Sequence, residues 1–515
     1  MRYKLRGFLL AASTILPYTL LADRPSDSVA VRKPNIVVVL ASDLGYGDLG
    51  VYGQSKIETP YIDRLASQGA RFTNFYSGSS SFAPSLCSML TGKHVGKAAI
   101  RGTDEWVERG SVMNYVKVLM DSTLEGQRPM PLGEETIANR VREKGYVTGA
   151  VGLWGLGSAT TQGSPLLHGF DSFYGYTCLR QAQTYYPKYL WRNDSKVSMD
   201  NALVFPNMKL PTNADPYKDE SYLSYTLEHY APDSILMAAL RFVEVNKSNP
   251  FFLLYSAQLP QAPLQVPQER VRRYRLKFGE EEPYLGLNGG CPNRTPRATY
   301  AAMVSYLDDQ VGMLVEKLKA EGVYDNTIII FTSATGAASQ SGVDGAFFES
   351  AGKHPLGKGR GSGFLFESGI KVPMIAVWPS VIAPNQVVDQ IGIGYDVFST
   401  LADVAGVDSV ASGDGISLLP VLKGKSQENQ HEYLYWENAD NLGHIALRMG
   451  KWKLLGRNMS YDEPYFELYD LEADPEENND VSEQNPDVVC RMVDLILNAR
   501  TSPSISSFKL RYLED

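Results

Sequence analysis

In this 515-residue chain, residues 34–48, PNIVVVLASDLGYGD, give the clearest indication of the fold class. Residues 36–41 form a short, unbroken apolar run, which is typical of a strand buried on both faces of a sheet. A turn-rich segment, 43–48, follows it directly. Because open α/β sheets place ligand sites at the carboxyl ends of their strands, we expect a functional loop immediately after this strand.

Outward from this stretch, apolar strands alternate with amphipathic helices, the pattern of an α/β fold. The longest predicted helix, 297–321, carries apolar side chains at helical spacing on one face. We predict further helices at 134–144, 234–245 and 396–405, and further strands at 147–151, 251–255, 327–331 and 372–378.

The composition and the secondary-structure pattern of the sequence change after residue 405. Residues 406–431 are rich in Gly, Ser, Asp and Gln, and we predict a linker there, between a large domain at 33–405 and a small one at 432–515. The small domain has the pattern of an antiparallel sheet followed by one helix, an α+β arrangement. Its predicted strands are 433–437, 445–448, 452–455 and 466–469, and its helix is 486–499.

The first 22 residues have the features of a signal peptide. Three basic residues precede an apolar run at 7–21, and the small residue Ala22 ends it. The alternative is a transmembrane anchor, but Pro17 interrupts the run, which falls short of the roughly 20 residues a spanning helix needs. We therefore expect export with cleavage, to the periplasm or the extracellular space, and no membrane span afterwards.

Composition narrows the possible partners. The chain has 49 Lys and Arg against 58 Asp and Glu, a net charge of −9, which argues against nucleic acid as the partner. Its four cysteines are too few and too scattered for a disulfide scaffold, and no two have metal-ligand spacing. Sequence alone does not pair Cys87, Cys178, Cys291 and Cys490.

Several local phrases resemble the formylglycine-dependent sulfatases, an arylsulfatase-like family of the alkaline phosphatase superfamily. They follow one another in family order from about residue 33 to the C-terminus. The resemblance implies a large mixed sheet between helices, and a small C-terminal domain with an antiparallel sheet and one helix. The phrases include 34–48, TPYIDRLA at 59–66, TGKH at 91–94, ESGIKVP at 367–373 and ELYDL at 467–471.

The resemblance also implies a chemistry that this chain lacks the residues to perform. Family members cleave sulfate esters with a formylglycine made from the Cys of a Cys-x-Pro-x-Arg motif. Here that motif is FAPSL, with Phe82 at the Cys position and Leu86 at the Arg position. A phenyl ring cannot become an aldehyde. Neither Ser81 nor Ser85 lies two residues before Pro84, and an unactivated hydroxyl is a weak nucleophile.

The implied calcium site is similarly depleted. The family's paired aspartates after the first strand appear as Ser42 and Asp43, and a later Asp-Asn pair appears as Ala334 and Thr335. Calcium takes six to eight oxygen ligands, usually including several carboxylates. Only Asp43 remains, so we expect neither calcium nor formylglycine as a cofactor.

Other family positions have lost their cations and imidazoles. Leu153 stands at a Lys position, Gln183 and Gln261 at His positions, and Ser362 at the spacing of another Lys. Loss of all these groups together leaves a more nearly neutral site, which avoids an unpaired buried charge. The cations that remain as candidates for the substrate pocket are Lys93, Lys358 and Arg360.

We therefore predict an exported sulfatase-family protein without sulfatase activity. It would bind a glycan or a small neutral ligand in the altered cleft, or act through a partner such as an active paralogue. If Phe82, Leu86 and Leu153 converge, the floor of that cleft is apolar. The alternatives are an active sulfuric-ester hydrolase that uses an atypical residue set, and a purely structural extracellular protein.

Overall fold

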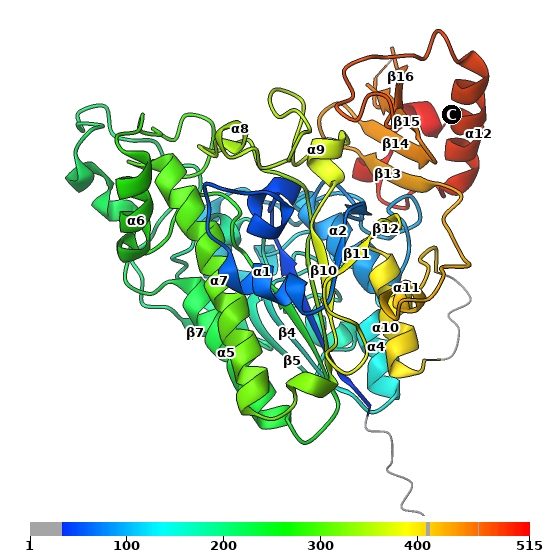
Figure 1. The fold of residues 1–515 in the computed structure, drawn as a ribbon. Coiled ribbons are helices and arrows are strands. Elements are labelled where there is room, and N and C mark those ends of the chain that lie inside the picture. The colour runs from blue at the N-terminus through cyan, green and yellow to red at the C-terminus, as the bar shows by residue number, and fades with distance from the viewer. Residues whose placement is uncertain (1–32, 408–412, 462, 515) are drawn as a thin grey trace, which may run out of the picture. The chain divides into compact units, whose positions relative to one another are not determined.

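Strand β1 (Asn35–Ala41) forms where the apolar run predicts it, and all seven of its residues are buried. It lies in the middle of a ten-stranded mixed sheet, parallel to β8 (Phe251–Ser256) on one side and to β9 (Thr327–Ser333) on the other (Figure 1). The computed structural model describes residues 33–407, 413–461 and 463–514, so the predicted signal peptide lies outside the described residues.

The strands that complete the sheet order β11-β2-β10-β9-β1-β8-β4-β5-β6-β7 are β11 (Gln386–Val388), β2 (Ala70–Phe72), β10 (Met374–Val377), β4 (Val147–Leu153), β5 (Ser172–Tyr176), β6 (Tyr189–Arg192) and β7 (Ser195–Ser198). The large sheet is parallel from β9 to β5 at its centre, and β10 is antiparallel to both of its neighbours. Strands β6 and β7 are added antiparallel at one end, whereas β11 pairs parallel with β2 at the other end. This arrangement confirms the predicted α/β class. A separate two-stranded sheet pairs β3 (Phe75–Tyr76) with β12 (Gly392–Ile393).

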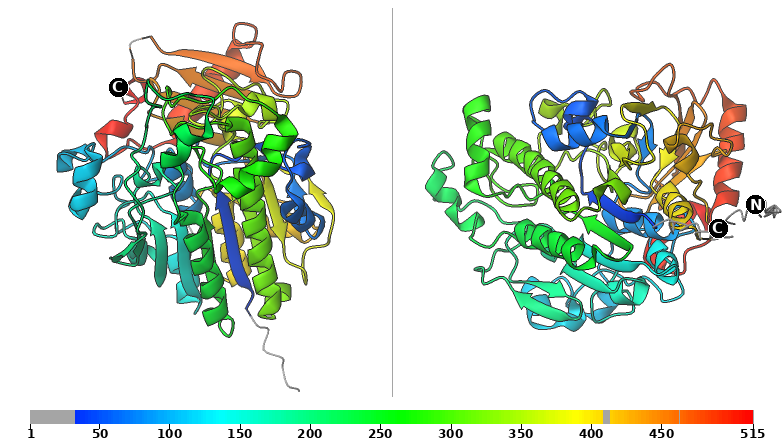
Figure 2. Two further views of the ribbon diagram at one scale, coloured as in Figure 1. Left: turned by 90° about the vertical axis from the view of Figure 1, so that its left-hand side faces the viewer. Right: turned by 60° about the horizontal axis from the view of Figure 1, so that its bottom comes forward.

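Helices cover both faces of the large sheet (Figures 1 and 2). On one face α7 (Pro296–Ala320) packs against α1 (Pro60–Ser67) and α5 (Ala231–Asn246). On the other face α10 (Asp396–Ala405) packs against α2 and α4. The bounds of the other helices are α2 (Phe82–Thr91), α3 (Tyr115–Met120), α4 (Ile137–Glu143), α6 (Gln268–Phe278), α8 (Gly345–Phe348), α9 (Glu367–Ile370) and α11 (Leu419–Leu422).

A four-stranded antiparallel sheet follows near the C-terminus, in the order β13-β14-β15-β16. Helix α12 (Pro486–Ala499) packs on one face, where its Met492 joins Tyr435 and Leu454 in a buried cluster. On the other face Trp436 packs with Phe366 of the large-sheet region. Both faces of this sheet are therefore buried. Its strands are β13 (Leu434–Asn438), β14 (His444–Met449), β15 (Trp452–Arg457) and β16 (Tyr465–Asp470).

The predicted elements are all present, with small shifts at their ends. Helices α10 and α12 begin and end at the predicted residues. Helix α4 begins at Ile137, three residues later than predicted, because Thr136 caps it: its side chain accepts a hydrogen bond from the backbone N–H of Asn139. The predicted linker contains the short helix α11, and the two-domain division stays a prediction, because residues 33–515 form one compact unit.

Two further predictions concern the whole chain. The four cysteines are free thiols, three buried and Cys490 exposed. Within the described segments, the helices are too short or too polar to cross a membrane. The predicted cleavage and export stay predictions.

Candidate functional site

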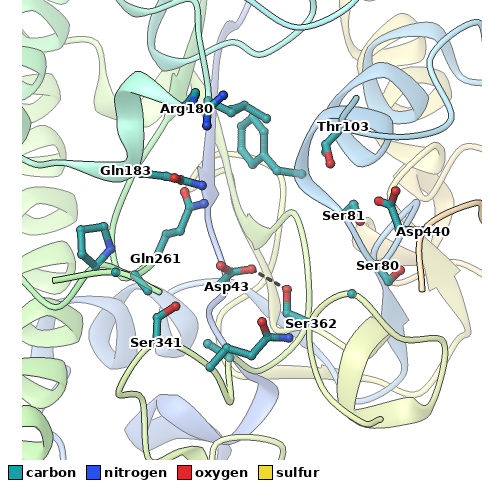
Figure 3. Close-up of a pocket in the computed structure, with 18 of the residues that line it drawn as sticks. Asp43, Ser80, Ser81, Thr103, Arg180, Gln183, Gln261, Ser341, Ser362 and Asp440 are labelled. Carbon is teal, nitrogen blue, oxygen red and sulfur yellow. Dashed lines mark hydrogen bonds between the residues drawn. The ribbon is translucent and has the colours of Figure 1, made fainter. Parts of the chain in front are cut away.

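A cavity of about 510 Å³ opens at the carboxyl ends of the central strands (Figure 3). Polar side chains supply most of its wall. The residues that line it include Asp43, Ser81, Phe82, Thr103, Glu105, Arg180, Gln183, Gln261, Ser362, Asp440 and Asn441.

Asp43 lies at the base of this cavity and is bound by two hydroxyl groups. Its Oδ1 accepts hydrogen bonds from Thr335 Oγ1 at 2.6 Å and from Ser362 Oγ at 2.7 Å. Thr335 comes close because β1 and β9 run parallel, so the residues just after them meet at one edge of the sheet. Burial raises the pKa of Asp43, and the two hydroxyl donors counteract this rise.

The donor set around Asp43 does not fit a calcium ion. Ser42 turns away, because its Oγ donates to the carbonyl of Ala257 at 3.0 Å. Ala334 is fully buried and offers no side-chain oxygen. Thr335 donates its hydroxyl proton to Asp43, and no group of three or more His, Cys, Asp or Glu residues that could hold a metal occurs in the described part of the chain. Calcium needs several carboxylate or carbonyl oxygens, and this arrangement supplies one carboxylate.

Phe82 occupies the first position of helix α2 and lines the cavity. Its ring is 7% exposed and presents carbon atoms to the cavity, with no group that could attack sulfur. Leu86, one turn along the same helix, is fully buried and does not line the cavity, and the same holds for Leu153 at the end of β4. The three side chains therefore do not converge on the cavity, which was the condition for an apolar floor, because the two leucines pack into the core instead.

The two glutamines at the family's His positions both line the cavity. Gln183 lies in a short helical turn at 181–183, and Gln261 follows the end of β8. Oε1 of Gln261 is buried and receives no hydrogen bond from the described residues. The two side chains therefore offer neutral amides where the resemblance implies ionisable imidazoles.

The three cations predicted for the pocket lie elsewhere. Lys93 forms an ion pair with Glu134 at 2.7 Å. Arg360 donates to the carbonyls of Glu476 and Glu477, and its guanidinium stacks over the Phe366 ring at 4.1 Å. Lys358 is exposed to solvent. None of the three lines the cavity, because two have partners outside it and the third extends into water.

The sequence prediction missed the contribution of the C-terminal sheet. The turn between β13 and β14 brings Asp440 and Asn441 to the cavity wall. Asn438 fixes this turn, since its Nδ2 donates to Ser80 Oγ at 3.0 Å and to the Gly363 carbonyl at 3.2 Å. The turn-forming residues between the predicted strands 433–437 and 445–448 indicated a hairpin, but they did not indicate that the hairpin would lie at the cavity.

A buried ionic cluster fixes the C-terminal sheet beside the loop that carries Ser362. Lys453 of β15 lies 2.9 Å from Glu367 Oε1 and 2.7 Å from Glu477 Oε1, and its side chain is inaccessible to solvent. Glu477 also accepts from the backbone N–H of Glu367 at 2.7 Å, at the start of α9. These contacts, with those of Arg360, fix the C-terminal sheet against the loop that carries Ser362, so both lie at fixed positions in the cavity wall.

Comparisons with known proteins agree with this architecture. Residues 34–407 match the family described as Sulfatase, and residues 361–500 match the family described as N-sulphoglucosamine sulphohydrolase, C-terminal. An N-acetylgalactosamine-6-O-sulfatase of Bacteroides thetaiotaomicron is 28% identical, over 91% of this chain and 94% of the relative. The human N-acetylgalactosamine-6-sulfatase is 30% identical, over 83% of this chain and 72% of the relative.

The fold has a counterpart among solved structures as well. The crystal structure of the protein named Ps i-CgsB superimposes with a TM-score of 0.70 and 26% sequence identity. The match covers 92% of this chain and 94% of that one. Because the matched family region, residues 34–407, contains the whole ten-stranded sheet and more than half of the chain, the chain belongs to the sulfatase family.

Proposed function

We propose that this sulfatase-family protein binds a glycan in the cavity beside Asp43 and does not hydrolyse sulfate esters. The observation that carries the proposal is Phe82, whose ring stands at the start of α2 where the reaction needs a nucleophile. The hydroxyl and amide groups around it are suited to hydrogen bonds with sugar hydroxyls. The sugars in the names of the relatives support a carbohydrate ligand.

The proposal includes the setting of the protein. We propose that residues 1–22 direct export and are removed, so that the protein meets its glycan in the periplasm or outside the cell. An active paralogue is a partner consistent with this role, since it would hydrolyse the glycan that the present chain retains. Mass spectrometry of the secreted protein would test the cleavage, and a mature N-terminus at residue 23 is expected.

A second candidate function, sulfate ester hydrolysis with an atypical residue set, is favoured by the relatives, which are named as sulfatases. Asp43, at the base of the cavity, is a carboxyl that suits it, as are Glu105 and Asp440, because a carboxyl whose pKa is raised by burial can serve as a general base. In this reading one of these carboxyls would activate a water molecule. The two candidates therefore differ in a measurable rate.

The experiment that separates them uses the full mature protein. We expect no turnover of an aryl sulfate at high protein concentration, with or without added calcium, and no difference between wild type and Asp43→Asn. Turnover that disappears in Asp43→Asn would establish the second candidate. Turnover that persists in Asp43→Asn but disappears in Glu105→Gln or Asp440→Asn would assign the base to another cavity carboxylate, and turnover that persists in all three variants would point to a contaminating enzyme.

Glycan binding is tested on an array of oligosaccharides with a variant that fills the cavity. Thr103 lines the cavity and Thr212 is an exposed turn residue outside its lining, so Thr103→Trp and Thr212→Trp form a matched pair. We expect the first to abolish binding and the second to preserve it. Equal binding by both variants would place the glycan elsewhere on the protein.

A further inference from the structure

The charge that lines the cavity is unlike that of a site for a sulfate ester. Three carboxylates, Asp43, Glu105 and Asp440, face it together with a single guanidinium, that of Arg180. Arg180 is also partly engaged, because its Nη1 approaches Met113 Sδ at 2.9 Å and the Val112 carbonyl at 3.5 Å. The wall of the cavity is therefore net negative.

Hydrogen-bonding capacity points in the same direction. Hydroxyls and amides can donate or accept, so Ser81 or Gln183 would suit either a sulfate or a sugar hydroxyl. Carboxylates only accept when ionised, and a sulfate ester has only acceptors. The carboxylate of Asp440 is exposed at the cavity and receives no hydrogen bond from the described residues. It can accept from a ligand that donates, whereas a sulfate ester has no donor to offer it.

From these two features we infer that the cavity takes a sugar presenting hydroxyl or ammonium donors, and that it discriminates against the sulfated form of the same sugar. The inference rests on the proposed glycan-binding function and gives it a ligand class. A sulfate group in this cavity would lie against like charge and would offer no donor to Asp440. An unsulfated or amino sugar would donate to that carboxylate.

The test compares matched glycans on the wild-type protein. An array carrying each oligosaccharide in a 6-sulfated and an unsulfated form, including forms built on N-acetylgalactosamine, identifies the best pair, which is then titrated by calorimetry. We expect the unsulfated form to bind at least about tenfold more tightly, because like-charge contacts are strongly unfavourable in such interfaces. Equal or tighter binding of the sulfated form would overturn the inference but keep glycan binding. Binding of neither form would overturn the proposed function, and the inference with it.

A charge reversal sharpens the test. Asp440 is exposed at the cavity rim, and its hydrogen bonds with the described residues use its backbone alone. Its N–H donates to Asn438 Oδ1 at 2.9 Å and its carbonyl accepts from the N–H of Gly443 at 3.1 Å, so Asp440→Lys should fold normally. Glu483, exposed before α12, provides the matched control Glu483→Lys. We expect Asp440→Lys to shift the preference towards the sulfated glycan by about tenfold. An unchanged preference in Asp440→Lys, with both variants showing the wild-type melting temperature, would show that the cavity charge does not select the ligand.

Discussion

Two groups of buried carboxylates in this protein meet opposite surroundings. At the junction with the C-terminal sheet, Glu367 and Glu477 share the ammonium of Lys453. In the loop after β1, Asp43 and Asp48 have hydroxyl and backbone N–H donors and no cation. Asp48 is fully buried and accepts from Ser350 Oγ at 2.6 Å, Tyr300 Oη at 2.7 Å and the backbone N–H of Gly45 at 2.8 Å.

The protonation of these groups differs accordingly. Burial raises the pKa of Asp48 to about 6, against the effect of its three donors. Burial also opposes ionisation of Glu367, but Lys453 together with Arg448, His354 and Lys371 outweighs it and holds the pKa of Glu367 well below its usual range. Glu477 contacts the same ammonium, yet burial and the neighbouring charge of Glu367 raise its pKa to about 7. The protein therefore keeps the charge of a buried carboxylate where several cations surround it. Around the cavity it uses neutral donors instead.

The largest expected effect comes from removing the cation of the junction. Lys453→Met removes the ammonium that both buried carboxylates contact, so we expect a loss of about 3–5 kcal/mol in the free energy of unfolding. Chemical denaturation measures it. Lys451→Met, which removes an exposed partner of Asp470, is the matched control and should have a much smaller effect. Equal losses in the two variants would show that the buried ion pairs of Lys453 contribute no more to stability than the exposed ion pair of Lys451.

The next effect is the pH dependence contributed by Asp48. Its pKa is about 6 in the folded state and about 4 in the unfolded state, so the folded state binds the proton more tightly. Asp48 therefore contributes about 2–3 kcal/mol of stability below pH 4, and this contribution is lost as the pH rises through 6.

Unfolding free energies measured between pH 4 and 6.5 test this for wild type and Asp48→Asn. We expect the variant to lose that part of the slope, whereas Glu483→Gln, at an exposed site, should retain it. A wild-type slope in Asp48→Asn would mean that Asp48 is ionised throughout this range, as a carboxylate with a cationic partner would be.

A smaller effect is expected at the hydroxyl that supports Asp43. Thr335→Val keeps the shape of the side chain but removes the 2.6 Å hydrogen bond to Oδ1, so we expect a loss of about 1–2 kcal/mol in the free energy of unfolding. Thr212→Val, at an exposed site, is the control for the substitution itself. No loss at Thr335 would indicate that water replaces the hydroxyl without cost.

The smallest expected effect is that of calcium. A ligand at 100 times its dissociation constant stabilises a protein by about 2.7 kcal/mol, so a tight site would be obvious in thermal unfolding. With millimolar calcium we expect the melting temperature of the wild type to equal that in a chelator. A clear rise with calcium that Asp43→Asn abolishes would show that Asp43 binds a cation and is not served by neutral donors alone.

Apolar runs and helical spacing predicted the strands and helices well, because the formation of these elements depends mainly on residues that are close in the sequence. The unbroken apolar run at 36–41 became a buried strand, and the helical spacing at 297–321 became α7 with bounds shifted by one residue. The phrases shared with the sulfatases likewise located Phe82, Asp43, Gln183, Gln261 and Ser362, all of which line one cavity.

What the sequence determined by itself was which residues stand at the family's reactive positions, because that depends only on order along the chain. The tertiary structure decided which side chains reach the cavity: it buried Leu86 and Leu153, turned Arg360 towards two carbonyls and brought in Asp440 from the C-terminal sheet. The physical reason is that a side chain's direction depends on the partners it finds across the fold. Those partners lie more than a hundred residues away for Arg360, and no local pattern records them.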